Sequence, residues 1–167
     1  MWIVDQHVAH ERAIVDRLTD DEGSSLPTTQ ALLVPEVVEL PLGEASAATE
    51  YLEELAVYGF EVEPFGPNSF RITGVISTLA GRDVAGAFKE ALAAAKGTGP
   101  GRRREDHILA TIACHSAVKL GDKLEKPEMQ ALIKDWLQSS LPATCPHGRS
   151  ICYRIGVNEV ARKLDRH

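Results

Sequence analysis

The sequence predicts an α+β domain with two lobes, and three observations support this prediction. Helical and strand periods follow one another along the 167 residues, and 44% of them are apolar, which is enough for a compact core. A Gly/Pro/Arg stretch at residues 97–104 ends a long middle segment. Side chains that can bind metals lie near both ends. We therefore expect residues 1–29 and 105–167 to form one lobe and residues 30–104 an inserted α/β lobe.

The elements follow from periodicity and from turn residues. A short apolar strand ends at Val4, a helix extends to about Leu18, and a polar loop leads into the middle segment. That segment is predicted to hold a strand at residues 31–40, a helix at 44–58, a strand pair at 60–65 and 69–75, and an Ala-rich helix at 83–96. Helices at about 105–120 and 127–139, a strand at 150–155 and a helix from residue 158 complete the chain.

Composition excludes several classes of protein. No apolar run approaches the ~20 residues of a membrane span and no signal-peptide pattern is present, so we expect a cytoplasmic protein that does not bind membranes. Three cysteines argue against a disulfide framework. With 18 basic and 24 acidic residues, the net charge of −6 argues against a self-sufficient DNA binder. The basic run at residues 102–104 could contact phosphates or be an ordinary solvated loop.

The most informative segment is Asp-Gln-His-Val-Ala-His-Glu-Arg-Ala-Ile-Val-Asp at residues 5–16. In a helix, His7 and Glu11 share one face, and Ile14 and Leu18 continue the same stripe. The two polar side chains should therefore point inward. Burying them is costly unless they are paired with each other or bound to a metal.

Two further segments supply possible ligands. Cys145-Pro146-His147-Gly148-Arg149 places a thiol and an imidazole two residues apart in a stiff loop. Cys114 lies in a predicted helix among small residues, which allow another element to approach closely. A set of thiols and imidazoles with few carboxylates favours zinc over magnesium or calcium.

Each segment also has an ordinary structural interpretation. His7 and Glu11 could form a satisfied pair, and Cys114 could be a small buried residue, the usual fate of a free cysteine. His10 and His115 are expected to be outer-shell or surface groups.

Together the three segments carry a family resemblance. Residues 5–16 resemble the Asp-Gln-His-Ala-x-x-Glu-x-x-x-x-Glu signature of the C-terminal endonuclease domain of MutL, a DNA mismatch repair family. Residues 113–119 and 145–149 resemble that family's Ala-Cys-(His/Arg)-x-Ala-x-Lys and Cys-Pro-His-Gly-Arg-Pro motifs, in the same order. The resemblance implies a domain that uses metal ions to nick one strand of duplex DNA. It also implies that the lobe built from the chain ends mediates dimerisation and that the inserted lobe is regulatory.

The resemblance assigns roles to individual positions. Asp5 takes the place of the leading aspartate of the catalytic metal centre, with Glu11 beside it, and Mn²⁺ or Mg²⁺ would serve catalysis. Arg149 could neutralise a phosphate or be an ordinary structural arginine. The zinc-associated positions of the family correspond to His7, Glu11, Cys114, Cys145 and His147.

The chain departs from the family pattern at several places. Asp16 replaces the final Glu of the signature, and at about 100° per residue it lies opposite His7, so we expect an ordinary surface pair with Arg12. Val8 adds bulk beside the site, and Ser150 replaces a proline, which should make the loop less rigid. Family members carry a further strand ahead of the signature, so we expect the chain to be truncated at its amino end, with weaker dimerisation.

A fourth feature concerns partners. Gln30, Leu32, Leu33 and Pro35 match the Gln-x-Leu-(Leu/Ile)-x-Pro peptide that docks on the β sliding clamp, although residues 31–40 could equally be a plain buried strand. The resemblance further implies a homodimer, the mismatch-recognition protein MutS, and an N-terminal MutL ATPase domain absent from this chain. These partners would deliver the DNA, and the domain would work at the nucleoid.

Two other functions remain open. A zinc-stabilised dimerisation and clamp-docking module that does not cut DNA is possible, because some MutL relatives lack the nuclease motifs. A zinc hydrolase of small substrates is less favoured, because the sequence has no His-Glu-x-x-His helix and no Gly-rich phosphate loop.

Overall fold

The computed structural model describes residues 1–19, 28–97, 103–140, 143–145 and 148–165. Helices and two small antiparallel sheets confirm the α+β class. The chain divides into two compact units. Unit 1 comprises Met1–Arg17 and Ala117–His167, and unit 2 comprises Leu18–Ser116. None of the helices in the described ranges is long and apolar enough to cross a membrane.

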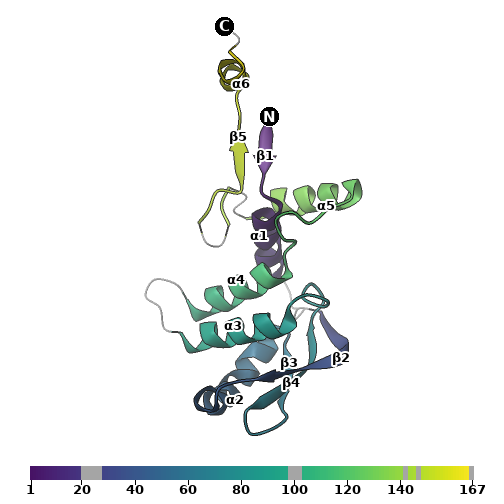
Figure 1. Ribbon diagram of the computed structural model, residues 1–167, viewed down its shortest axis with the longest axis vertical. Coiled ribbons are helices and arrows are strands. Elements are labelled where there is room, and N and C mark those ends of the chain that lie inside the picture. Colours follow the sequence, from purple (N-terminus) through teal and green to yellow (C-terminus); the bar gives the residue numbers. More distant parts are fainter. Residues whose placement is uncertain (20–27, 98–102, 141–142, 146–147, 166–167) are drawn as a thin grey trace. The chain divides into compact units, whose positions relative to one another are not determined.

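Unit 1 brings the two ends of the chain together. Strand β1 (Trp2–Val4) pairs antiparallel with β5 (Cys152–Arg154), with Ile3 opposite Tyr153 (Figure 1). This unit also contains helix α1 (Gln6–Thr19) as far as Arg17, where the unit ends. Helices α5 (Lys126–Leu137) and α6 (Val157–Lys163) belong to it as well. Its core consists of Val8, Ala9, Val118, Leu132, Trp136, Cys145 and Ile151.

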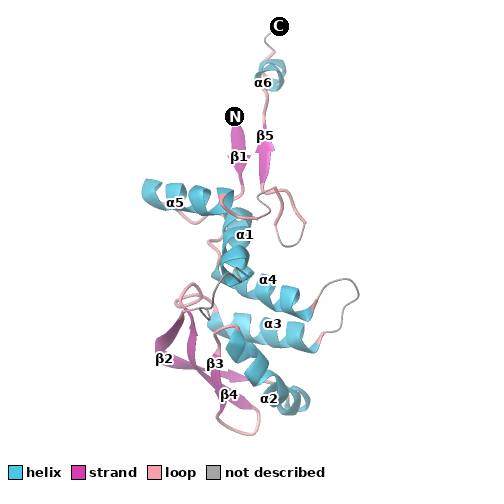
Figure 2. Ribbon diagram, turned by 180° about the vertical axis from the view of Figure 1, so that it is seen from behind, coloured by secondary structure: helices cyan, strands magenta, loops and turns pink. Residues whose placement is uncertain are grey.

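Unit 2 is a three-stranded antiparallel sheet covered by helices. Strand β4 (Ser69–Ile76) lies between β2 (Thr29–Glu39) and β3 (Glu61–Pro64). The helices are α2 (Leu42–Val57), α3 (Val84–Lys96) and α4 (Arg104–Ser116), and α3 and α4 lie side by side (Figure 2). Buried residues of the sheet and of all three helices form one apolar core, in which the rings of Phe60 and Phe88 meet edge to face at 6.0 Å.

Strand β2 carries an irregularity at the predicted clamp-binding peptide. Its pairing with β4 shifts between Ala31 and Glu36, and Pro35 cannot donate to a ladder because it lacks an N–H group. The Leu33 side chain is fully exposed, whereas Val38 and Leu40 further along are buried. The interpretation of residues 31–40 as a plain buried strand is therefore wrong for their first half.

Helix α4 ends at Ser116, earlier than the predicted end near residue 120. The chain turns instead, since the N–H of Val118 donates to Nδ1 of His10 rather than to a carbonyl of the preceding turn. The structure groups α4 with unit 2, whereas the predicted lobe boundaries put it with the chain ends. The roles of the lobes in dimerisation and regulation stay predictions.

Candidate metal centre

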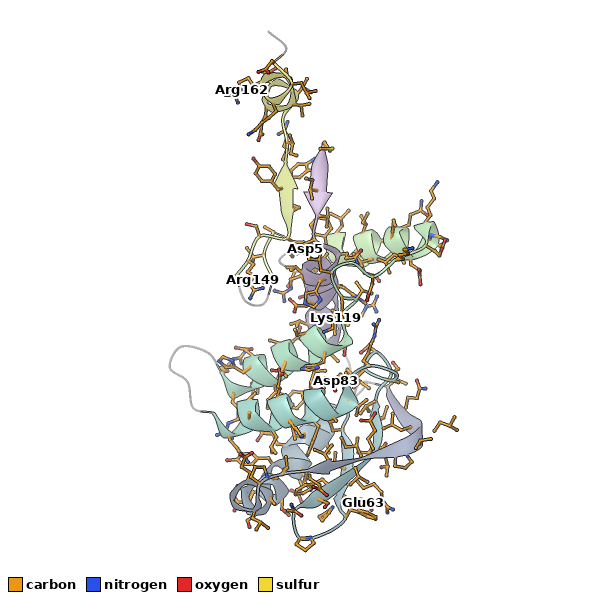
Figure 3. All side chains as sticks on the ribbon, in the orientation of Figure 1. Asp5, Glu63, Asp83, Lys119, Arg149 and Arg162 are labelled. Atoms are coloured by element: carbon orange, nitrogen blue, oxygen red, sulfur yellow. The ribbon has the colours of Figure 1, made fainter. Side chains whose placement is uncertain are left out.

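Asp5 joins β1 to α1 and caps the helix. Its Oδ1 accepts the backbone N–H groups of His7 at 3.0 Å and of Val8 at 3.2 Å, and its own N–H donates to the Ile151 carbonyl at 2.9 Å. These donors are the second and third residues of α1, the usual partners of an N-cap carboxylate. The hydrogen bonds that begin α1 thus also fix the position of the Asp5 carboxylate, which lies at the start of the helix (Figure 3).

His7 and Glu11 meet one turn apart on α1, as their spacing predicted. The Nε2 of His7 lies 3.1 Å from Oε1 of Glu11. Glu11 is only 4% exposed, and His7 is half-buried. A carboxylate buried to this extent needs a charged or hydrogen-bonding partner, and the imidazole is in position to be one.

The tautomer of His7 follows from its other nitrogen. Nδ1 lies 2.8 Å from the carbonyl oxygen of Val118, which can only accept, so Nδ1 carries the hydrogen. In the neutral ring Nε2 then offers its lone pair toward the Glu11 carboxylate. Two acceptors this close require either a proton or a cation between them.

The donor pair fits a zinc ion. Two ligand atoms at zinc-bond lengths in a tetrahedral arrangement are about 3.3 Å apart. The 3.1 Å between His7 and Glu11 is close to that spacing. The Val118 carbonyl matches the backbone acceptor that commonly orients a zinc-bound histidine through its other nitrogen.

Cys145 lies in the same unit as His7, in a tight loop. Its N–H donates to the Arg149 carbonyl and its carbonyl accepts from Gly148, both at 2.9 Å, and Gly148 has a φ of +80°. The backbone N–H of Arg149 points at the Cys145 sulfur from 3.3 Å, an arrangement suited to a thiolate ligand. An antiparallel bridge between Thr144 and Ser150 closes the loop.

The other predicted site residues lie as follows. Cys114 is half-buried on α4 in unit 2, so its place in the ligand set rests on the sequence alone. His147 lies outside the described residues. Arg149 has an exposed side chain. In the predicted clamp-binding peptide, Leu32 packs against the core of unit 2, while Gln30, Leu33 and Pro35 are exposed.

The expected surface pair between Arg12 and Asp16 is instead buried. Arg12 is 8% exposed, and its Nη2 donates to Oδ1 of Asp16 at 2.7 Å. The second oxygen of Asp16 accepts the backbone N–H of Ser140, at the end of the α5 segment. The prediction failed because the face of α1 opposite His7 packs against other parts of unit 1 rather than facing solvent.

Gln6 and His10 also contact the backbone of unit 1. The sequence analysis expected His10 to be an outer-shell or surface group, but it did not single out Gln6. The side chain of Gln6 donates to two carbonyls, of Lys119 and Asp122, and His10 accepts the N–H of Val118. A backbone partner more than 100 positions away leaves no signal in side-chain patterns.

Comparisons with known proteins point to one family. The family model described as the MutL C terminal dimerisation domain matches residues 1–124. The chain is 35% identical to the DNA mismatch repair protein MutL of Koribacter versatilis, over 99% of this chain and 26% of that protein. It is 33% identical to that of Acidobacterium capsulatum, over 99% and 25%, and 35% identical to that of Methylocella silvestris, over 98% and 28%. The chain thus spans about a quarter of the length of these relatives.

Proposed function

The chain belongs to the family of MutL C-terminal dimerisation domains, and from this premise we propose that it is a metal-dependent endonuclease domain that nicks one strand of duplex DNA in mismatch repair. The observation that carries the proposal is the buried pair of His7 and Glu11, whose facing acceptor atoms suit a bound cation. The same pair would also hold zinc in a module that does not cut DNA, so the nicking activity itself has to separate the two candidates.

We assign zinc binding to His7, Glu11, Cys114, Cys145 and His147. The proposal is supported by the His7–Glu11 spacing and by the backbone N–H that faces the Cys145 sulfur. Cys114 and His147 enter it through their motifs alone. A bound divalent ion, Mn²⁺ or Mg²⁺ at the catalytic position, supplies a water of lowered pKa and stabilises charge on the scissile phosphate.

Asp5 and Glu11 are the proposed catalytic carboxylates. Because Oδ1 of Asp5 is held by two backbone N–H groups, the orientation of this carboxylate is fixed before any ligand arrives. Arg149, exposed on the loop that follows Cys145, is placed in the proposal as a phosphate contact. The net charge of −6 means that the DNA is delivered by other components, for which we propose MutS and the N-terminal MutL ATPase domain, at the nucleoid in the cytoplasm.

We further propose that the β sliding clamp docks on strand β2. Leu33 is fully exposed, and the pairing of β2 with β4 is interrupted around it. A leucine in this state loses no packing in its own domain when it enters a groove of the clamp. Gln30 and Pro35, also exposed, complete the peptide, with Leu32 as its inner residue.

Homodimerisation through unit 1 is part of the same proposal. An apolar groove of about 580 Å³ opens on this unit, lined by Trp2, Ile133, Trp136, Leu137 and Cys152 among others. Exposed apolar side chains on β1 and α5 surround it, notably Trp2 and Leu137. Apolar surface of this kind is typical of a protein interface, and a second copy is the partner that the family's description supports.

The second candidate is a dimerisation and clamp-docking module that is stabilised by zinc and does not cut DNA. One observation favours it. Asp5 already has a structural role as the cap of α1, so its presence does not by itself require catalysis.

Plasmid nicking separates the two candidates. Purified protein is incubated with supercoiled plasmid and Mn²⁺, with and without the clamp, beside the Asp5→Asn variant. Nicking by the wild type, increased by the clamp and lost in the variant, would support the endonuclease. A folded, zinc-loaded wild type that leaves the plasmid supercoiled even with clamp would favour the non-cutting module.

A further inference from the structure

Residue Val118 is bound on both sides by histidines of α1. Its N–H donates to Nδ1 of His10 at 3.1 Å, and its carbonyl accepts from Nδ1 of His7 at 2.8 Å. Since a backbone N–H can only donate and a carbonyl can only accept, Nδ1 is a lone pair in His10 and an N–H in His7. The contact with His10 therefore holds Val118 in place, and the carbonyl of Val118 sets the tautomer of His7.

The chain after Val118 forms a tight turn that Gln6 holds against α1. The N–H of Asp122 donates to the Lys119 carbonyl at 3.1 Å, with Gly121 at a positive φ of +95°, and the Asp122 carboxylate accepts the Lys119 N–H at 2.8 Å. Nε2 of Gln6 donates to the carbonyls of Lys119 and Asp122, at 2.8 and 3.0 Å. This residue thus fixes both ends of the turn.

We propose that Gln6 and His10 are positioning residues for His7: they hold the 118–122 turn so that the Val118 carbonyl accepts a hydrogen bond from Nδ1–H, and the lone pair of Nε2 can then bind the metal. The inference rests on the metal centre of the proposed function and adds two residues to it. Neither residue needs to touch the ion, because each acts on His7 through the backbone of the turn.

The effect should be large enough to measure. Loss of an outer-shell partner of a metal-bound histidine typically costs about 10–100-fold in metal affinity. Without the Val118 carbonyl, the ring can place its proton on Nε2 and donate it to Glu11, 3.1 Å away. That arrangement satisfies both side chains but removes the lone pair that a metal requires.

Two variants remove the support of the turn, and two serve as controls. In Gln6→Glu the shape is kept, but a carboxylate replaces the donor that faces two carbonyls. His10→Leu removes the acceptor for the Val118 N–H, whereas His10→Asn places an amide oxygen where Nδ1 was. Ile151→Val perturbs the core of the same unit at a residue that is 1% exposed and does not belong to the turn.

The first measurement is the tautomer of His7 by ¹⁵N NMR in the full chain freed of metal. We expect Nδ1 to carry a hydrogen in the wild type, in His10→Asn and in Ile151→Val, and to lose it in Gln6→Glu and His10→Leu, where the hydrogen stays on Nε2. Zinc affinity, measured by chelator competition, should fall by about 10–100-fold in Gln6→Glu and His10→Leu and stay unchanged in the two controls.

A wild-type His7 ring without a hydrogen on Nδ1 would overturn the inference without recourse to any variant. So would a His7 tautomer that stays unchanged in both Gln6→Glu and His10→Leu. A wild type that shows the expected tautomer responses but binds no zinc would instead contradict the proposed metal centre, and the positioning of His7 would still be supported.

Discussion

The imidazole of His7 and the carboxylate of Glu11 lie 3.1 Å apart on one face of α1, with Glu11 almost fully buried. Because the Val118 carbonyl engages the Nδ1 hydrogen of His7, the contact brings a lone pair against a carboxylate. The pair is therefore arranged to bind a cation, and the metal proposal can be tested at Nε2 of His7.

Glu11→Gln should separate metal binding from folding. The amide can donate to Nε2 of His7, so we expect the metal-free variant to be at least as stable as the metal-free wild type. Zinc at 100 times its dissociation constant should stabilise the wild type by about 2.7 kcal/mol and the variant by much less. Thermal unfolding with and without a chelator measures both quantities. Equal zinc stabilisation of the two proteins would contradict the assignment of Glu11 as a ligand.

Two substitutions at Asp5 should have different consequences. Asparagine caps helices about as well as aspartate, so Asp5→Asn should abolish nicking with little change in the free energy of unfolding. Asp5→Ala loses the cap as well and should cost about 0.5–2 kcal/mol. Denaturant unfolding beside the plasmid assay checks both. If Asp5→Asn nicks like the wild type, the residue is a cap alone.

Breaking the pair of Arg12 and Asp16 should destabilise unit 1. Asp16→Ala leaves a buried guanidinium without its carboxylate and should cost about 3 kcal/mol, since the side chains are only 9% and 15% exposed. The double variant Arg12→Met/Asp16→Ala should recover much of that loss, because no buried charge is left unpaired. Denaturant unfolding measures the free energy of unfolding of the two single variants and of the double variant, which completes a double-mutant cycle. A cost of a few tenths of a kcal/mol for Asp16→Ala would restore the surface-pair interpretation.

The double variant Gln30→Ala/Leu33→Ala should lose clamp binding and keep the stability of the wild type. Both side chains are exposed, so their truncation removes no packing within the domain. Leu42→Ala, at another exposed leucine of unit 2, is the matched control and should bind the clamp normally. Surface plasmon resonance with immobilised clamp measures the binding of each protein. Undiminished binding by the double variant would remove the clamp assignment.

Leu137→Asp should convert a homodimer into a folded monomer. The side chain is exposed on α5 and lines the apolar groove of unit 1, so a charge there penalises only the associated state. Leu33→Asp changes a leucine of unit 2 that is even more exposed, and it should leave the association unchanged. Sedimentation equilibrium gives the masses. A dimer in both variants would place the interface elsewhere.

Most regular elements were predictable because their signals are local. The face shared by His7, Glu11 and Ile14 predicted α1, and the strand pair expected at residues 60–65 and 69–75 corresponds to β3 and β4. Asp83 was the expected start of the Ala-rich helix, and its side chain accepts the Gly86 N–H at 2.9 Å as an N-cap does. Period and capping are properties of a few neighbouring residues, so they can be read without the fold.

Features that depend on distant backbone were not predictable. Helix α4 stops at Ser116 because the following residues bond to side chains of α1. Arg12 looked like a surface residue because its charge and its spacing to Asp16 are typical of an exposed pair. Its burial depends on how α1 packs within unit 1, which a single helix does not encode.

The sequence by itself determined the chemistry that this chain can offer: an imidazole and a carboxylate one helical turn apart, and thiols in two further motifs. Only the tertiary structure decided how that chemistry is presented. The proton of His7 sits on Nδ1 because a carbonyl 111 positions along the chain lies 2.8 Å away, and Glu11 is buried because α1 packs inward at that face. Donor types are properties of residues, whereas tautomer and burial are set by which atoms the fold brings into contact.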